Sequence, residues 1–247
     1  RTRDPRVVRR TARIVADVRG RGDRAVAEWT KRTTGAATPH ETPLEKAALE
    51  AGWAATPRDV RRAIRFAVRN VERVAVRQIP RPFAVTVVPG VRVEQRVEAL
   101  ASVGCYVPGG RYPLASTLVM TAVPARVAGV DRVVVACPRP APAVLCAALE
   151  AGVTEFFVMG GAQAIAALAY GTKAVRRVDK IVGPGSAWVA AAKDIVSGDV
   201  AIDFHAGPSE IVVLAHRGRA AWIAADLIAQ AEILEHPDGH VELTLAA

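Results

Sequence analysis

From residue 102 onward, short apolar runs alternate with longer runs of helical character, and this alternation constrains the fold more than any other feature. The apolar runs predict strands at 103–107, 132–136, 155–159 and 180–182. The segments between them predict helices at 116–128, 142–151, 162–170 and 187–196. Strands that alternate with helices favour parallel pairing, so this part of the chain predicts an α/β fold with a parallel sheet and helices on its faces.

The N-terminal segment predicts helices rather than strands. A helix begins at Asp4, and Asp23 can cap a second helix after a glycine-rich break. Thr56 and Pro57 have the residue types of an N-cap and a first helical position. The apolar residues that follow recur at three- and four-residue steps, which indicates a long amphipathic helix.

Further strands are expected on either side of the alternating segment. Two β-type runs at 84–88 and 91–97 flank a Pro-Gly turn signal and predict a hairpin. After residue 200, the pattern predicts two strands, a helix and a terminal strand, at 200–204, 211–215, 220–232 and 241–247. The terminal run has the character of an interrupted strand, so we expect more protein after it.

Composition limits the class of protein. Apolar residues make up 51% of the 247 residues and charged residues 23%, which suits a globular protein with a sizeable core. The net charge of +9 is compatible with binding of nucleic acid or of an anionic substrate. We find no pattern of interleaved aromatic residues that would make a stacking platform. We therefore expect an arginine-rich surface and no nucleic-acid partner.

The cysteines and the apolar runs bear on the cellular compartment. Cys105, Cys137 and Cys146 stand in apolar stretches without a paired spacing, so we expect buried thiols rather than disulfides or a cysteine-based zinc site. The sequence contains no signal-peptide pattern and no uncharged apolar run long enough to span a membrane. A cytoplasmic protein without membrane contact is the expectation.

Three strand-to-helix loops are rich in glycine, and in a parallel sheet such loops form the ligand-binding edge. The loops are 106–113, 159–164 and 183–186. Tyr106 begins the first loop, which is either a cofactor contact or a plain tight turn. Gln163 follows a glycine pair that offers free N–H groups and a helix dipole to an anion. Ser186 ends the third loop, where a serine usually caps the next helix.

Two later segments gather polar side chains. Asp203, His205 and Ser209 lie close together in the sequence, and a His-Ser pair can indicate acyl transfer. No oxyanion or nucleophile-elbow pattern accompanies this pair, so a serine hydrolase is disfavoured. Gln230 and His236 lie among carboxylates near a helix end, which can hold a metal or can be a solvated helix terminus.

Taken in order, these segments resemble histidinol dehydrogenases. The matching stretches cover nearly the whole chain: RGD (21–23) with AVAEWT (25–30), VGCYVPGG (103–110), STLVMTAVPARVAGV (116–130), GGAQAIAALAYGT (160–172), DKIVGPGSAWV (179–189), AIDFHAGPSEIVVLA (201–215) and DLIAQAE (226–232). A series of ordered matches is far more specific than any single glycine motif.

The resemblance implies an NAD-dependent, zinc-containing homodimer. Such an enzyme oxidises L-histidinol to L-histidine in two hydride transfers, through an aldehyde, at the end of histidine biosynthesis. The resemblance also implies two Rossmann-like α/β domains. Residues 104–205 would form the second domain, inserted into a first domain made of 1–103 and 206–247, which would be incomplete.

Individual site residues follow from the same resemblance. Tyr106, Gln163 and Ser186 stand where the family contacts NAD, with Ser186 in place of the usual asparagine. Ser209 matches a substrate-contacting serine, and Gln230 matches a ligand of both zinc and substrate.

The resemblance is weaker for the metal and the catalytic base. Ile233 stands where the family has its next zinc ligand, a histidine, so His236 is the replacement ligand that we expect. The family's general-base Glu-His pair and its other zinc ligands lie in a C-terminal half outside these 247 residues. Oxidation of an alcohol needs a base to take its proton. We therefore expect impaired or absent activity from this chain by itself.

Two alternatives remain within the enzyme fold. One is a non-catalytic remnant that keeps the fold and nucleotide affinity without turnover. The other is a related dehydrogenase that acts on another small polar alcohol. A nucleic-acid binder is a third, weaker possibility that would require strongly salt-dependent retention of DNA or RNA.

Overall fold

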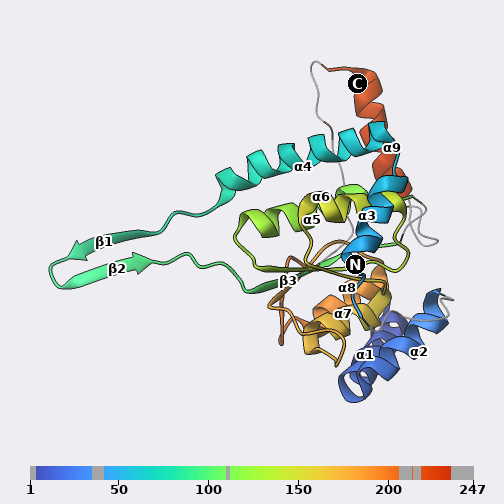
Figure 1. Ribbon diagram of the computed structural model, residues 1–247. Helices are drawn as coiled ribbons and strands as arrows, with labels where there is room; N and C mark the ends of the chain where they lie inside the picture. Colours follow the sequence, from blue (N-terminus) through green and yellow to red (C-terminus); the bar gives the residue numbers. More distant parts are fainter. Residues whose placement is uncertain (1–3, 35–41, 110–111, 206–212, 214–217, 235–247) are drawn as a thin grey trace. The chain divides into compact units, whose positions relative to one another are not determined.

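Figure 1 shows a computed structural model of the protein, which describes residues 4–34, 42–109, 112–205, 213 and 218–234. Residues 2–206 form one compact unit, and the residues from 207 onward belong to a second unit. The described helix of the second unit is α9 (Ala220–Leu234), which confirms the helix predicted at 220–232. Apart from Val213, the strands predicted at 211–215 and 241–247 lie outside the described residues.

The centre of the first unit is a five-stranded parallel sheet with the order β5-β4-β3-β6-β7. Its strands are β3 (Ser102–Tyr106), β4 (Arg132–Ala136), β5 (Glu155–Phe157), β6 (Lys180–Val182) and β7 (Ala201–Ile202). If β3 is counted as strand 1, the order reads 3-2-1-4-5, which is the order of the dinucleotide-binding α/β sheets. The direction in which successive strands are added to the sheet reverses between β3 and β6. The predicted α/β class with a parallel sheet is confirmed, although β5 and β7 are shorter than the sequence pattern predicts.

Helices cover both faces of this sheet (Figure 1). On one face lie α5 (Ala115–Val127) and α6 (Pro142–Ala151), with α3 (Lys46–Ala55) and α4 (Arg58–Gln78) packed on them. On the other face lie α7 (Gly161–Tyr170) and α8 (Ala187–Val196), with α1 (Pro5–Arg21) and α2 (Asp23–Thr34) packed on them. The N-terminal helices are therefore distributed over the two faces of the sheet.

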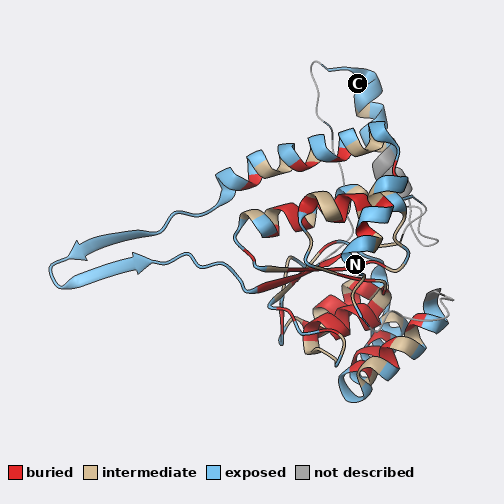
Figure 2. Ribbon diagram, viewed as in Figure 1, coloured by how far each residue is buried: buried red, intermediate tan, exposed pale blue. Residues whose placement is uncertain are grey.

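The two central strands are buried on both sides, as Figure 2 shows. Because side chains alternate along a strand, Val103 and Cys105 contribute to the core under α5 and α6, whereas Val134 and Ala136 contribute to the core under α7 and α8. Gly104 faces α7 so closely that a Cβ atom there would lie 3.1 Å from a methyl group of Leu168.

The three cysteines are buried and free, as the sequence predicts. Burial raises the pKa of Cys105 to about 12 and that of Cys137 to about 11. Both side chains therefore remain thiols at neutral pH and pack as small apolar groups.

The predicted hairpin is present. It consists of β1 (Phe83–Val88) and β2 (Val91–Gln95), which pair antiparallel around a turn where Gly90 has φ +84°. All residues of both strands are exposed within the described chain. The hairpin is not hydrogen-bonded to the five-stranded sheet in the first unit.

Two capping predictions are wrong. Thr56 does not cap α4, because α3 extends to Ala55 and the Thr56 hydroxyl donates a 2.7 Å hydrogen bond to the Gly52 carbonyl at the end of that helix. Asp23 is the first residue of α2, and its carboxylate accepts the N–H of Lys173 at 3.0 Å. In each case a contact with a neighbouring element replaces the local cap that the sequence pattern favours.

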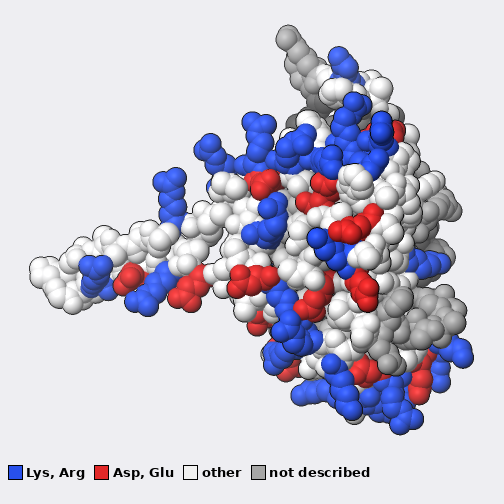
Figure 3. All heavy atoms as spheres, viewed as in Figure 1, with Lys and Arg blue, Asp and Glu red and all other residues white. Residues whose placement is uncertain are grey.

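Arginines gather on the exposed side of α4 (Figure 3). The guanidinium carbons of Arg61 and Arg65 lie 4.0 and 5.4 Å from the ring centroid of Trp53, and Arg65 also pairs with Glu150 at 2.8 Å. Much of the positive charge thus lies on the surface of α4, where some of the guanidinium groups stack on Trp53 or pair with a carboxylate. The expected absence of a nucleic-acid partner stays a prediction.

None of the helices in the described ranges has the length and hydrophobicity needed to cross a bilayer.

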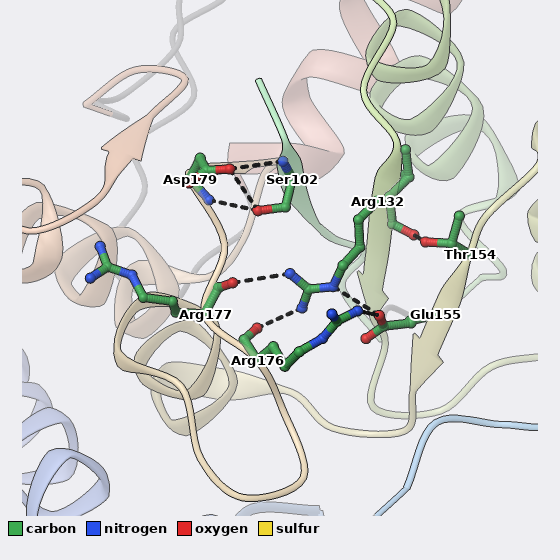
Figure 4. A network of polar contacts seen from close by, with 8 residues as sticks. Ser102, Arg132, Thr154, Glu155, Arg176, Arg177 and Asp179 are labelled. Atoms are coloured by element: carbon green, nitrogen blue, oxygen red, sulfur yellow. Dashed lines mark hydrogen bonds and ion pairs between the residues drawn. The ribbon is translucent and has the colours of Figure 1, made fainter. Parts of the chain in front are cut away.

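A polar network holds the amino ends of the parallel strands in register (Figure 4). Arg132 donates to Glu155 at 2.8 Å and to the carbonyls of Arg176 and Arg177 at 2.6 and 3.0 Å. Beside it, the Asp179 carboxylate accepts both the N–H and the hydroxyl of Ser102 at 2.8 Å. The network ties β3, β4 and β5 to the segment that leads into β6.

We expect Arg132→Gln to lower the free energy of unfolding by about 2–3 kcal/mol, because it removes the charged donor of two carbonyls and the less exposed of the two guanidinium donors of the largely buried Glu155 carboxylate. The Arg132 side chain is 13% exposed, whereas that of Arg176, which contacts the same carboxylate, is 74% exposed. Arg176→Gln is therefore the matched control, with an expected loss below about 1 kcal/mol. Urea unfolding followed by circular dichroism measures both, and equal losses would contradict this account.

Candidate functional site

A cavity of about 480 Å³ lies at the carboxyl ends of the parallel strands. The residues on its sheet side follow β3, β4, β5 and β6; they are Tyr106, Pro108, Pro138, Gly161, Gln163 and Ser186. Ligands of open α/β sheets bind at this edge, where the strand order reverses. The volume is within the usual range of small-molecule sites. The structure therefore brings the three predicted NAD contacts, Tyr106, Gln163 and Ser186, to one cavity.

Tyr106 is a neutral phenol whose hydroxyl accepts the N–H of Gly161 at 3.0 Å. Burial raises the pKa of Tyr106 above its ordinary value, and this outweighs the opposing effect of the Gly161 hydrogen bond. The phenol therefore keeps its proton at neutral pH. No acceptor for that proton is found among the residues that the structure describes, so the O–H is free to donate to a ligand.

Gln163 is 1% exposed, and its amide is anchored on one side only. The Thr33 hydroxyl donates to the Trp29 carbonyl at 2.8 Å and so accepts from Gln163 Nε2 at 3.0 Å. This pairing fixes the orientation of the amide, because the single hydroxyl proton is already used. Gln163 Oε1 has no partner among the described residues. A buried acceptor without a donor is costly, which makes it a strong point of attachment for a ligand N–H or O–H.

Two glycines allow the loops to approach this close. Gly161 has φ +72°, and a Cβ there would lie 2.7 Å from Gln163 Oε1. Gly183 has φ +113°, and its Cβ would run into the carbonyl oxygen of Tyr106. Residues with a side chain rarely adopt such φ values, so both positions favour glycine.

Ser186 occupies the N-cap position of α8, as its residue type favours, but its hydroxyl makes no capping hydrogen bond. The residue is exposed and lines the cavity. The local prediction of a serine N-cap is therefore correct in position, while the hydroxyl remains available to a ligand.

A buried ion pair holds the loop between β6 and α8 in place. Lys193 pairs with the Asp203 carboxylate and donates to the Gly183 carbonyl at 3.0 Å, and the same carboxylate accepts the Gly183 N–H at 2.8 Å. His205 instead lies 2.7 Å from Asp194. Asp203 and His205 thus have separate partners, and Ser209 lies outside the described residues.

The described residues do not fit a zinc site. His236 lies outside them, and Gln230 lies in α9, where the structure describes only the backbone. Across the described ranges, no group of three or more His, Cys, Asp or Glu is arranged to hold a metal ion. Ile233, at the position of the expected next ligand, has no ligating atom.

The wall of the cavity opposite the sheet was missed by the sequence reasoning. It consists of Arg10 from α1, Thr33 from α2 and Trp188 from α8; Arg139, from the loop after β4, was missed as well. These residues carry no motif of their own. The one available signal was the amphipathic pattern of α1, which indicates that this helix packs on another element but not on which one.

The sheet order and the cavity at its switch point place the chain in the class of open α/β folds in which ligands bind at this edge of the sheet. Within that class, the family model described as histidinol dehydrogenase matches residues 1–239. The chain therefore belongs to the histidinol dehydrogenase family, as the sequence motifs predict.

Individual relatives agree with this assignment. The chain is 48% identical to histidinol dehydrogenase of Cereibacter sphaeroides over 227 residues, which is 90% of this chain and 52% of that protein. It is 49% identical to histidinol dehydrogenase of Caulobacter vibrioides over 225 residues, 90% of this chain and 53% of that protein. The crystal structure of histidinol dehydrogenase from Elizabethkingia anophelis matches with a TM-score of 0.85 at 31% identity, over 94% of this chain and 55% of that one. The chain spans about half the length of the curated relatives it matches.

We expect Gly183→Ala to lower the free energy of unfolding by about 2–3 kcal/mol, because the new Cβ combines a strained φ with a collision against the β3 backbone. Gly198→Ala is the matched control, since a Cβ at that exposed position meets nothing within 4 Å. Urea unfolding of both variants measures the difference. Equal unfolding midpoints would show that the loop between β6 and α8 relaxes freely and that its conformation is not imposed by packing.

Proposed function

We propose that this chain binds NAD in the cavity at the carboxyl edge of its parallel sheet and that it serves the oxidation of L-histidinol to L-histidine. The observation that carries the proposal is the buried Gln163 side chain, which lines the cavity and whose amide oxygen Oε1 has no donor among the described residues. Membership of the histidinol dehydrogenase family supports the identity of the cofactor and of the substrate.

In this proposal the chain's residues bind and orient the cofactor. Gln163 Oε1 accepts from a cofactor N–H or O–H, and the Tyr106 hydroxyl donates while it stays anchored to the Gly161 N–H. Ser186 offers a further hydroxyl at the rim. When bound, NAD supplies the hydride acceptor. The Gln163 and Tyr106 side chains are already held by hydrogen bonds with Thr33 and Gly161, so little ordering of these two side chains is left to occur on binding.

The other expected parts of the family's site stay predictions. They are the substrate contacts of Ser209 and Gln230, the zinc ligands Gln230 and His236, the domain division at residues 104–205, the homodimeric full-length form and the cytoplasmic location. Each rests on the resemblance, or in the last case also on the absence of a targeting pattern, and none is carried by a contact of the described residues.

We expect Tyr106→Phe and Gln163→Met each to weaken NADH binding by about 5- to 10-fold, the loss of one or two ligand hydrogen bonds. Tyr170→Phe is the matched control, because its hydroxyl donates to Asp199 at 3.0 Å and does not line the cavity. Titration of NADH fluorescence gives the dissociation constants, and urea unfolding shows that each variant is folded. Unchanged affinity in both site variants, or no binding by the parent chain, would refute the proposed site.

We expect this chain to bind NAD without producing NADH from L-histidinol. The reason is the proton that must leave the alcohol with the hydride, because no His, Asp or Glu lines the described cavity to take it. Absorbance of NADH in the presence of L-histidinol, NAD and zinc measures turnover. A steady rate that is lost in Gln163→Met would show that a base within these 247 residues serves the reaction, and would overturn this expectation.

A further inference from the structure

Two arginines line the same cavity. Arg10 belongs to α1 and Arg139 to the loop between β4 and α6, so they reach the cavity from two elements far apart in the sequence. Both side chains are exposed, and no Asp or Glu is among the described lining residues. Within the described chain neither guanidinium is ion-paired with a carboxylate. The cavity therefore carries two positive charges that no described acidic group neutralises.

The position of Arg10 follows from the packing of α1. Arg10 lies one helical turn before Ile14, and residues four apart share a helix face. Ile14 is buried in the core with α7 and also lines the cavity, so this face of α1 is the inner one. The Arg10 guanidinium lies 5.5 Å from the ring centroid of Trp188 on α8. A cation–π contact at this distance steadies the side chain without using its N–H donors.

A third source of positive potential is the start of α7. The N-cap residue Gly160 has no side chain to cap the helix, and Gly161 and Ala162 line the cavity, so the positive end of the helix dipole lies at the cavity. The Gly161 N–H is already used, because it donates to the Tyr106 hydroxyl. The unpaired Gln163 carbonyl oxygen in the same turn requires a donor. A ligand that suits this cavity has an anionic group together with hydroxyl or amino donors.

We propose that Arg10 and Arg139 bind the diphosphate bridge of the cofactor. This inference rests on the proposed NAD site and extends it to a recognition element supplied by the N-terminal helix α1. A diphosphate carries two negative charges at neutral pH, which match the two guanidinium groups, and arginine binds phosphate oxygens through paired N–H donors. The affinity for a nucleotide then depends on its phosphates as much as on its base and ribose.

The experiment compares ADP with adenosine as ligands of the same chain by isothermal titration calorimetry. Arg10→Gln and Arg139→Gln should each weaken ADP binding by about 5- to 20-fold, the effect of losing one partly exposed charge-assisted contact. Adenosine affinity should change by less than about 2-fold, because it carries no phosphate. Raising the salt concentration from about 0.05 to 0.3 M should weaken ADP binding by the parent chain more than ADP binding by a variant that carries both Arg10→Gln and Arg139→Gln.

Arg9→Gln is the matched control, because it removes the same charge from an exposed neighbouring position of α1 that does not line the cavity. If Arg9→Gln weakens ADP binding as much as Arg10→Gln, the effect is one of net charge and the inference is overturned. If the two cavity variants weaken NADPH but leave NADH and ADP unchanged, the arginines recognise a 2′-phosphate and the assignment to the diphosphate is wrong.

The design separates this inference from the proposed function. If the parent chain binds NADH and ADP and both cavity variants bind them equally well, the arginine contacts are refuted while the NAD site stands. If the parent binds neither NADH nor ADP, the NAD site itself is refuted, and the arginine contacts with it. Circular dichroism and urea unfolding confirm that each variant keeps the parent's fold, and Arg139→Gln, in a loop, tests the proposal independently of any change in α1.

Discussion

Burial of β3 and β4 on both faces is the constraint on which the rest of this structure depends. Valines alternate into two cores, so each face of the sheet needs its own layer of helices. Because helices cover both faces of the sheet, the ends of these strands are the parts of their backbone that other groups can reach. At the amino ends Arg132 and Asp179 form hydrogen bonds with the polar groups of neighbouring strands, and these bonds make up a structural network. At the carboxyl ends lie the glycine loops and the cavity, where Gln163 Oε1 has no donor among the described residues.

The second wall of the cavity depends on the docking of α1 and α2. Their apolar residues join the core formed with α7 and α8. Hydrogen bonds from Arg21 and Trp29 hold the pKa of Asp17 at about 2, so the carboxylate that joins the two helices is charged at neutral pH. Asp23 then fixes α2 to the segment after α7. This docking places Thr33 beside Gln163 and therefore decides which amide atom of Gln163 remains unpaired.

The electrostatics of the cavity differ from those of the helix α4 surface. On α4, Arg61 and Arg65 share Trp53, and Glu150 neutralises part of their charge. In the cavity, Arg10 also stacks on a tryptophan, but no carboxylate of the described lining accompanies it. Net charge taken from the sequence does not distinguish these two situations. The distinction depends on which side chains converge, and it separates a solvated basic surface from a site suited to an anionic ligand.

The sequence by itself determined the elements and their order. Alternation of β and α patterns predicted the parallel sheet, and the ordered motifs predicted the family and the residues Tyr106, Gln163 and Ser186. These features are local or periodic, so they can be recognised without knowing what each element packs against. The tertiary structure decided the cap lost at Thr56, the orientation of the Gln163 amide and the presence of Arg10 in the cavity. Each of these depends on contacts between elements far apart in the chain, for which the local sequence carries no periodic signal.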